Sequence, residues 1–302
     1  MTGTPPANRP ETHVSLWREH ARAFVQSPTA VVGLVVLVLV VLLAIFGPFI
    51  VPQNPYDLAQ LDMMDGMLPP GSEMGAGFTA WLGTDEQGRD LLSGIVYGMR
   101  ISLFIGVTSV VIAFLIGSSI GVLAAYRGGW VDTLLMRIVD LQLSFPAILV
   151  ALVMLSIFGA GVDKVLIALV MVQWAYYART VRGSALVEME REYVQAADSL
   201  ALPAWRVVFL HVLPNCMTPL IVVSTVQIAN AIALEATLSF LGVGVPVTEP
   251  SLGMLISKGF QYIMSGSYWI STLPGVAIVV IIMAINLVGD RLREILDPRS
   301  AR

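Results

Sequence analysis

The chain alternates long uncharged stretches with short charged connections. Five uncharged runs have the roughly 20 residues that a helix needs to cross the hydrocarbon core of a bilayer. They are Ala30–Val51, Ile101–Tyr126, Leu141–Val162, Val212–Leu234 and Trp269–Gly289. A sixth run, Val165–Ala178, has only 14 residues, a length that also fits a buried or re-entrant helix. We expect it to span, because Lys164 and Arg179 at its ends can extend their charged groups to the interface.

The composition supports this all-α integral membrane protein with six transmembrane helices. Hydrophobic residues make up 56% of the chain and charged residues 13%, against about 25% charged residues in soluble domains. The net charge of −4 offers no basic surface for nucleic acid. The single cysteine, Cys216, excludes an intrachain disulfide, and the three histidines stand in no metal-binding motif. We therefore expect no cofactor and no metal in this chain.

The positions of Lys and Arg predict the orientation. With both ends cytoplasmic, 13 of the 17 basic residues lie on the inner side, as the positive-inside rule requires. The resulting organisation is a cytoplasmic segment 1–28, a first transmembrane helix 29–51, an external loop 52–100, a transmembrane core 101–290 with a cytoplasmic loop 183–213, and a cytoplasmic tail 291–302.

The cytoplasmic loop carries an amphipathic helix, predicted over Glu188–Ala201. Its apolar stripe has the spacing i, i+3, i+4 and i+7 and consists of Tyr193, Ala196, Ala197 and Leu200. Pro203 ends this helix at Leu202, and a second helical stretch, Ala204–Val212, runs toward Pro214. The helix could lie on its own membrane or protein, or dock in the groove of a cytoplasmic partner. The small alanines and the acidic polar face favour the partner.

The segment EYVQAADSLALPAWRVVFLHVLPN resembles the loop that defines permease subunits of ATP-binding cassette (ABC) importers. Gln195, Ala196 and Ala197 stand at the family's E-A-A positions, Ala201 at its glycine, and Leu213 and Pro214 at its L-P. Gln195 thus replaces an acid, and Ala201 replaces a residue that supplies a left-handed cap. The resemblance implies an ATPase-coupling loop that comprises Glu192, Tyr193, Gln195, Ala196, Ala197, Asp198, Leu200, Ala201, Leu213 and Pro214.

Five further blocks are similar to the dipeptide/oligopeptide/nickel permease family, in particular to its second, C-type subunit. They are WLGTDEQGRDLLSGIVYGMRISL (81–103), RIVDLQLSFP (137–146), LSFLGVGVP (238–246), PSLGML (250–255) and GDRLREILDPR (289–299). The resemblance implies a type I importer fold, a bacterial inner-membrane location, and import of peptides by alternating access. The implied partners are a second permease, two cytoplasmic ATPases and an external substrate-binding protein.

Two groups of alternatives stay open at this point. Nickel chelates, glutathione and opines are also carried by such permeases. An ion-coupled secondary transporter would need paired carboxylates or broken helices at mid-membrane, together with an inverted repeat, and the sequence indicates neither. A membrane enzyme would need a nucleophile or His/Asp cluster at the interface, and the sequence has no such cluster. Because the chain has no GxxxxGK[ST] phosphate loop, ATP and Mg²⁺ are assigned to the partner ATPases.

Polar residues inside the spans are the candidates for the translocation path, because each is unfavourable in lipid unless it faces a cavity or a partner. Gln227 and Asn230 lie three residues apart, near mid-depth and on one face of the fifth span. Glu235, at the outer end of that span, either terminates the helix or contacts an outer gate. Further intramembrane polar residues are Asp140, Gln142, Gln173 and Asn286.

Three other patterns predict structure rather than chemistry. Gly117, Gly121 and Ala125 form a stripe of small residues along the second span, which allows another helix to approach closely. Arg137 and Asp140 are spaced to pair on one helix face. Three charged residues of the LGTDEQGRD block, Asp85, Arg89 and Asp90, are expected to cap a short interfacial helix and to pair locally.

Overall fold

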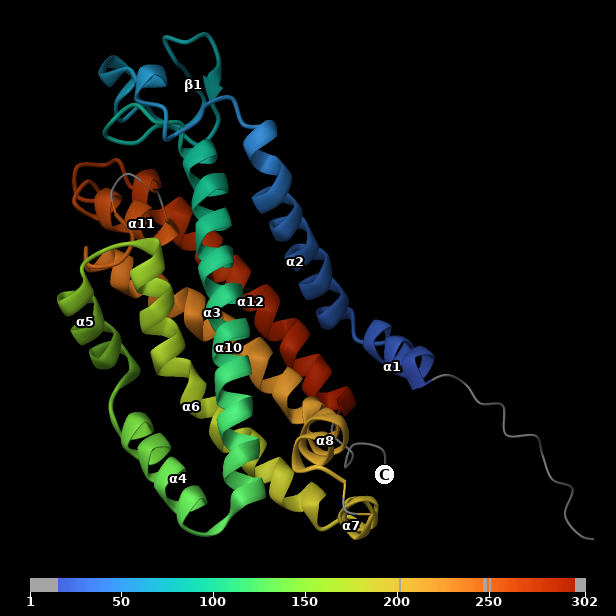
Figure 1. Cartoon of the computed structure of the whole chain (residues 1–302). Helices are drawn as coiled ribbons and strands as arrows, with labels where there is room; N and C mark the ends of the chain where they lie inside the picture. Colours follow the sequence, from blue (N-terminus) through green and yellow to red (C-terminus); the bar gives the residue numbers. More distant parts are fainter. Residues whose placement is uncertain (1–15, 201, 247–248, 250, 297–302) are drawn as a thin grey trace, which may run out of the picture.

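The computed structural model describes residues 16–200, 202–246, 249 and 251–296. Five long helices form the body: α2 (Pro28–Phe46), α3 (Leu91–Arg127), α6 (Val162–Met189), α10 (Met217–Phe240) and α12 (Trp269–Leu296). Figure 1 shows α3 running the length of the bundle between α2 and α6.

The structure only partly matches the six predicted spans. Within the described residues, four helices are long and apolar enough to cross a membrane, namely α2 with its 3₁₀ extension η1 (Gly47–Phe49), α3, α10 and α12. A fifth crossing is possible in length and composition if the bent pair α4 (Gly129–Ser144) and α5 (Ala147–Phe158) acts as one span. Helix α6 has 28 residues but is more polar, because its second half carries Arg179 and Arg182.

Helix α3 begins ten residues before the predicted second span. Asp90 caps its N-terminus by accepting hydrogen bonds from the backbone N–H of Ser93 at 2.8 Å and from the Ser93 hydroxyl at 2.6 Å. The prediction placed residues 91–100 in a loop because Arg100 interrupts the uncharged run. One exposed arginine does not interrupt the helix, since its side chain lies outside the packed face. Asp90 therefore caps α3 itself rather than a separate short helix.

The predicted third span, Leu141–Val162, is not a single helix. Its residues divide between α4 and α5, whose axes are bent by 91° at the break. Phe145 is extended (φ −90°, ψ 140°) and Pro146 follows it. A proline cannot donate the helical hydrogen bond and disfavours helical geometry in the residue before it, so the helix stops here.

The closest helix contact in the body joins α3 to α6. A Cβ atom added at Gly121 would overlap the carbonyl oxygen of Ala178, and one added at Gly117 would lie 2.6 Å from the Cβ of Tyr177. Ala178 and Tyr177 are fully buried on the facing side of α6. The stripe of small residues therefore allows the close approach that was predicted, and the approaching helix is α6 of this chain.

Two ion pairs connect α4 with the second half of α6. Arg182 binds Asp132 through two hydrogen bonds of 2.5 and 2.6 Å, and Arg179 pairs with Asp140. The predicted pair between Arg137 and Asp140 is therefore wrong. An arginine on the neighbouring helix reaches the carboxylate of Asp140, and a pairing rule for a single helix cannot foresee that partner.

The segment between α2 and α3 folds over the N-terminal end of α3 (Figure 1). It contains the 3₁₀ turns η2 (Leu58–Gln60) and η3 (Met63–Asp65) and a small antiparallel pair, β1 (Ser72–Glu73) and β2 (Thr79–Ala80). The side chain of Asp85 is buried and accepts from the backbone N–H groups of Gln87 and Arg89 at 2.8 and 2.9 Å. Burial raises the pKa of Asp85. Helix α11 (Leu252–Phe260) packs nearby against α12 and α3.

The two ends of the described chain meet at one end of the bundle. Helix α1 (Leu16–Val25) contacts the C-terminal part of α12, where the Arg291 guanidinium donates to the Ala23 carbonyl. In Figure 1 this contact lies toward the end that carries α7 and away from β1.

Candidate coupling and translocation sites

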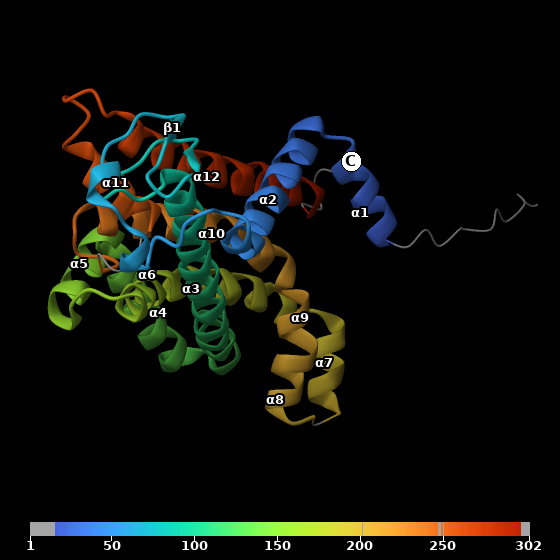
Figure 2. The same cartoon turned by 90° about the horizontal axis from the view of Figure 1, so that it is seen from above.

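The predicted coupling loop is a helical hairpin that projects from the bundle. Helix α7 (Glu192–Ser199) follows α6 after a two-residue turn, and the chain returns through α8 (Ala204–Val207), the π-helical turn η4 (Val208–Val212) and α9 (Leu213–Asn215). Figure 2 shows α7 and α8 side by side, clear of the other helices. The helical segment is shorter than the predicted Glu188–Ala201, because α6 itself extends to Met189.

The buried residues of α7 coincide only in part with the predicted apolar stripe. Val194 and Ala197 are buried, at 3% and 4% exposure, in the cluster that includes Val207 and Val208. Ala196 is exposed, and Leu200 keeps 74% of its surface exposed. The structure therefore separates Ala196 from Ala197 and assigns Ala197 to the packing of the hairpin. Sequence reasoning missed Val194, although its spacing of three from Ala197 marks an inner face.

The exposed face of α7 is formed by Glu192, Tyr193, Gln195, Ala196 and Ser199, and it continues into Leu200 directly after the helix. Apart from Tyr193, whose hydroxyl contacts Glu188 and Asn215, the described chain leaves this face open, so it is available to a partner. The side chain of Asp198 and the whole of Ala201, at the family's glycine position, lie outside the described residues.

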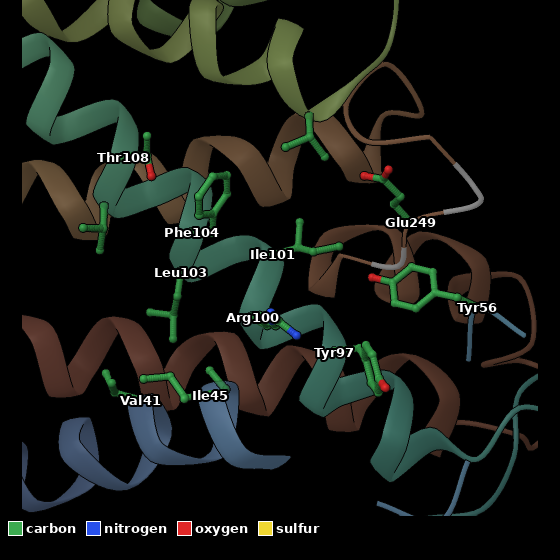
Figure 3. A pocket seen from close by; sticks show the side chains of 13 residues that line it. Val41, Ile45, Tyr56, Tyr97, Arg100, Ile101, Leu103, Phe104, Thr108 and Glu249 are labelled. Carbon is green, nitrogen blue, oxygen red and sulfur yellow. The ribbon is translucent and has the colours of Figure 1, made fainter. Parts of the chain in front are cut away.

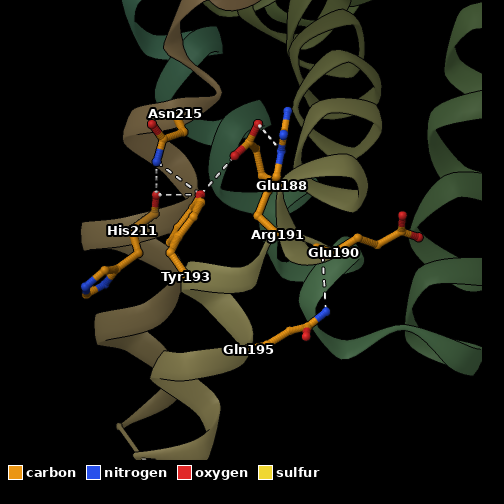
Figure 4. Close-up of polar contacts among 7 residues, drawn as sticks. All are labelled: Glu188, Glu190, Arg191, Tyr193, Gln195, His211 and Asn215. Carbon is orange, nitrogen blue, oxygen red and sulfur yellow. Dashed lines mark hydrogen bonds and ion pairs between the residues drawn. The ribbon is translucent and has the colours of Figure 1, made fainter. Parts of the chain in front are cut away.

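A polar network connects the start of α7 with η4 and α9, the returning part of the hairpin (Figure 4). The Tyr193 hydroxyl donates to Glu188 Oε2 at 2.9 Å and accepts from Asn215 Nδ2 at 3.1 Å. The same amide group donates to the His211 carbonyl at 2.7 Å. Burial, followed by the Glu188 carboxylate, raises the pKa of Tyr193. Glu188 and Asn215 therefore hold α7 at a set angle to α6 and α9.

Leu213 and Pro214 do not end the second helical stretch. They open α9, and helical geometry continues across both residues. The π-helical turn η4 lies directly before them. Because Pro214 has no N–H to donate to the preceding turn, a wider turn at this point accommodates it. The prediction that helix formation stops at Pro214 is wrong for this reason.

Gln227 and Asn230 line a pocket of about 420 Å³ between α5, α6 and α10. Asn230 Nδ2 donates to Gln227 Oε1 at 3.0 Å. Gln173 of α6 also lines the pocket, is buried, and its Oε1 atom accepts no hydrogen bond from the described residues. The pocket thus gathers three amide side chains, of which the sequence singled out two as a pair. The sequence does not link Gln173 to this pair, because Gln173 lies on another helix.

Glu235 does not line this pocket and does not terminate α10, which continues to Phe240. Its carboxylate is fully buried and accepts hydrogen bonds from the hydroxyls of Ser102 and Ser239, each at 2.8 Å. Ser251, which caps α11, lies near the same carboxylate. One side chain therefore connects α3, α10 and the start of α11.

We expect Glu235→Ala to lower the thermal stability of the purified protein strongly. The change leaves buried serine hydroxyls without their acceptor, at about 1–3 kcal/mol for each such group. Glu235→Gln keeps one acceptor oxygen and should be milder. Thermal unfolding followed by the fluorescence of a thiol-reactive dye at the buried Cys216 measures both. Equal unfolding temperatures for wild type and Glu235→Ala would contradict a connecting role.

Two family models match the chain. One, described as "Binding-protein-dependent transport system inner membrane component", covers residues 117–302. The other, "N-terminal TM domain of oligopeptide transport permease C", covers residues 15–70. The chain belongs to the permeases of binding-protein-dependent transport systems. The resemblance found in the sequence is thereby confirmed, and this permease is a multi-pass membrane subunit of an ABC importer.

Curated relatives of the permease cover nearly its whole length. It is 35% identical to a dipeptide transport system permease protein of Alkalihalophilus pseudofirmus, over 98% of this chain and 94% of the relative. It is 37% identical to a di/tripeptide transport system permease protein of Pseudomonas aeruginosa, over 97% and 96%. The corresponding dipeptide permease protein of Escherichia coli K12 is 40% identical over 91% of each chain.

A solved structure confirms the fold of the permease. A chain of the MetNI methionine ABC transporter, in an inward-facing conformation, matches with a TM-score of 0.55 and 21% identity. The match covers 68% of this chain and 96% of that chain. The type I importer permease fold is therefore shown.

Proposed function

We propose that this permease imports peptides, with di- and oligopeptides as its substrates, as the C-type subunit of a heterodimer. The observation that carries the proposal is the pocket between α5, α6 and α10, which is lined by the amides of Gln173, Gln227 and Asn230. Amide side chains both donate and accept hydrogen bonds, so they match the repeating N–H and C=O groups of a peptide backbone and are indifferent to its side chains. The names of the relatives agree with this substrate class.

The same pocket supports weak, transient contact. Gln227 already accepts from Asn230 at 3.0 Å, so a passing peptide exchanges one hydrogen bond for another. Gln173 Oε1 accepts no hydrogen bond from the described part of the chain, so it provides the first free acceptor for the peptide. Such exchange keeps each contact weak enough for release to the cytoplasm.

We propose that the exposed face of α7 docks in the groove of a cytoplasmic ATPase. A short helix held by the network around Tyr193 and Glu188 is preorganised for docking, because little conformational entropy remains to be lost. ATP and Mg²⁺ belong to two ATPase partners in this proposal, and an external binding protein delivers the substrate. ATP-driven closure of the ATPases would then move α7 and change the access to the pocket.

Reconstitution of the whole importer tests the proposed substrate. We expect uptake of a labelled dipeptide into proteoliposomes to require ATP, both permeases and the loaded binding protein, and the isolated chain to hydrolyse no ATP. A nickel chelate, glutathione and an opine, each supplied with its own binding protein, provide the competing substrates. Gln227→Leu should reduce peptide uptake without changing the assembly of the permease with its ATPases. Transport of the nickel chelate without any transport of the dipeptide would overturn the assignment of peptides as substrates.

We propose the membrane topology on the positive-inside rule, with residues 1–28, 183–213 and 291–302 cytoplasmic and residues 52–90 external. Reporter fusions after Gly71 and after Glu249 should then read external, and fusions after Glu190 and at Arg302 internal. The structure supports this arrangement, because α7 and β1 lie at opposite ends of the bundle (Figure 1). An external reading after Glu190 would exclude docking of α7 to a cytoplasmic ATPase.

A further inference from the structure

A groove of about 650 Å³ runs along α3 between α2 and the N-terminus of α6 (Figure 3). Its long walls are apolar. Ile45 of α2 and Phe104 and Val107 of α3 line it and keep 54%, 56% and 44% of their surface exposed. These side chains are not covered by the described chain, so the groove is open along its length.

One end of the groove is polar. Tyr56, Tyr97, Arg100 and Glu249 gather there (Figure 3). The two tyrosine rings meet edge to face with centroids 5.2 Å apart. Within the described ranges, the side chains of Arg100 and Glu249 form no hydrogen bond and no ion pair. Burial raises the pKa of Tyr56 to about 12, and the nearby Glu249 carboxylate adds to the effect.

An unpaired guanidinium beside an apolar membrane groove needs an anion, because its charge is unfavourable next to hydrocarbon. A phosphodiester supplies one in a geometry that a guanidinium can bind through two hydrogen bonds. The opposite charge on Glu249 fits an ammonium group on the same molecule. Tyrosines are enriched at the depth of lipid headgroups.

We propose that the groove binds one phospholipid of the phosphatidylethanolamine type. Arg100 holds the phosphate, Glu249 holds the ammonium, and one acyl chain lies along Ile45, Phe104 and Val107. On the topology proposed above, the lipid belongs to the outer leaflet. A peptide zwitterion also carries both charges, but the walls here are apolar and provide no amide partners for its backbone.

Native mass spectrometry of the complete, delipidated importer tests this site. Phosphatidylethanolamine, phosphatidylcholine and phosphatidylglycerol with identical acyl chains are titrated separately. We expect the first to bind about tenfold more tightly than the other two. Glu249→Gln should remove the preference over phosphatidylcholine, whose ammonium cannot donate a hydrogen bond. Arg100→Gln should remove the tightly bound lipid.

Arg293→Gln is the matched control, because it removes the same charge from the exposed end of α12. It should leave lipid binding unchanged. Equal binding of the three lipids by wild type and Arg100→Gln would overturn the proposal. Displacement of the bound lipid by a dipeptide would overturn it in favour of a substrate site.

A cysteine at Phe104 distinguishes lipid from a protein occupant. The native Cys216 is buried, so Phe104→Cys introduces the accessible thiol. We expect a bilayer-soluble maleimide to label it in the assembled importer. Cross-linking of this thiol to the second permease, without labelling by the maleimide, would show that a partner helix fills the groove and would overturn the lipid proposal.

Discussion

Ala196→Arg is expected to abolish peptide uptake while the amount of permease in the membrane stays near normal. Ala196 is exposed on α7, so the fold accommodates a long side chain at this position. In a docked complex the arginine would have to be buried without a partner or excluded from the groove. Either outcome costs several kcal/mol, which weakens docking about a hundredfold or more. Uptake and co-purification of the ATPases measure the effect.

Ala197→Arg is the matched variant, because the neighbouring alanine is buried inside the hairpin at 4% exposure. Its expected defect is a loss of protein rather than a loss of docking, since the new charge would separate α7 from α8. Immunoblots of membranes distinguish the two. Normal uptake by Ala196→Arg at normal abundance would show that the exposed face of α7 does not couple.

Gly121→Ala is expected to reduce the amount of folded permease severely, although it adds only one methyl group. That group would overlap the Ala178 carbonyl oxygen, and a backbone atom on a packed helix cannot turn aside as a side chain can. Separation of α3 from α6 would loosen the buried apolar cluster to which both helices contribute. We expect a destabilisation of about 3 kcal/mol, at the upper end for an overpacked core.

Gly183→Ala provides the control for this prediction. Gly183 lies on α6, and a Cβ atom there would meet nothing within 4 Å. Alanine favours the helix over glycine by about 1 kcal/mol, so this variant should be at least as stable as wild type. Thermal unfolding of the two purified variants compares them directly. Equal stability of Gly121→Ala and Gly183→Ala would contradict the close approach of the two backbones.

Features that depend on one helix or on local order could be predicted from the sequence. The small-residue stripe, the Asp90 cap and the amide pair Gln227–Asn230 all follow from spacing along a single element. The features that were missed depend on a second element. Asp140 pairs with Arg179 rather than Arg137, Ala197 packs against α8 rather than facing outward, and Gln173 reaches the pocket from α6.

The third span shows a different limit. A count of uncharged residues treats Leu141–Val162 as one run, because hydropathy carries no information about the direction of the helix axis. Pro146 stands inside that run, and the 91° bend follows from its missing N–H and from its effect on Phe145. A rule that divides apolar runs at internal prolines would have found the break, yet Pro274 lies inside the continuous helix α12. Tertiary contacts decide which proline breaks a helix.

The ion pairs between α4 and α6 also have a consequence for biosynthesis. Arg179 and Arg182 find their carboxylate partners on a helix that is synthesised earlier. On the proposed topology both arginines lie near the cytoplasmic interface, and if α6 left the translocon alone their guanidinium groups would lack these carboxylate partners. We therefore expect α4, α5 and α6 to leave the translocon as one unit, so that Asp132 and Asp140 can pair with the two arginines as soon as α6 has been synthesised. The order of these helices along the chain therefore matters for membrane insertion as well as for the folded transporter.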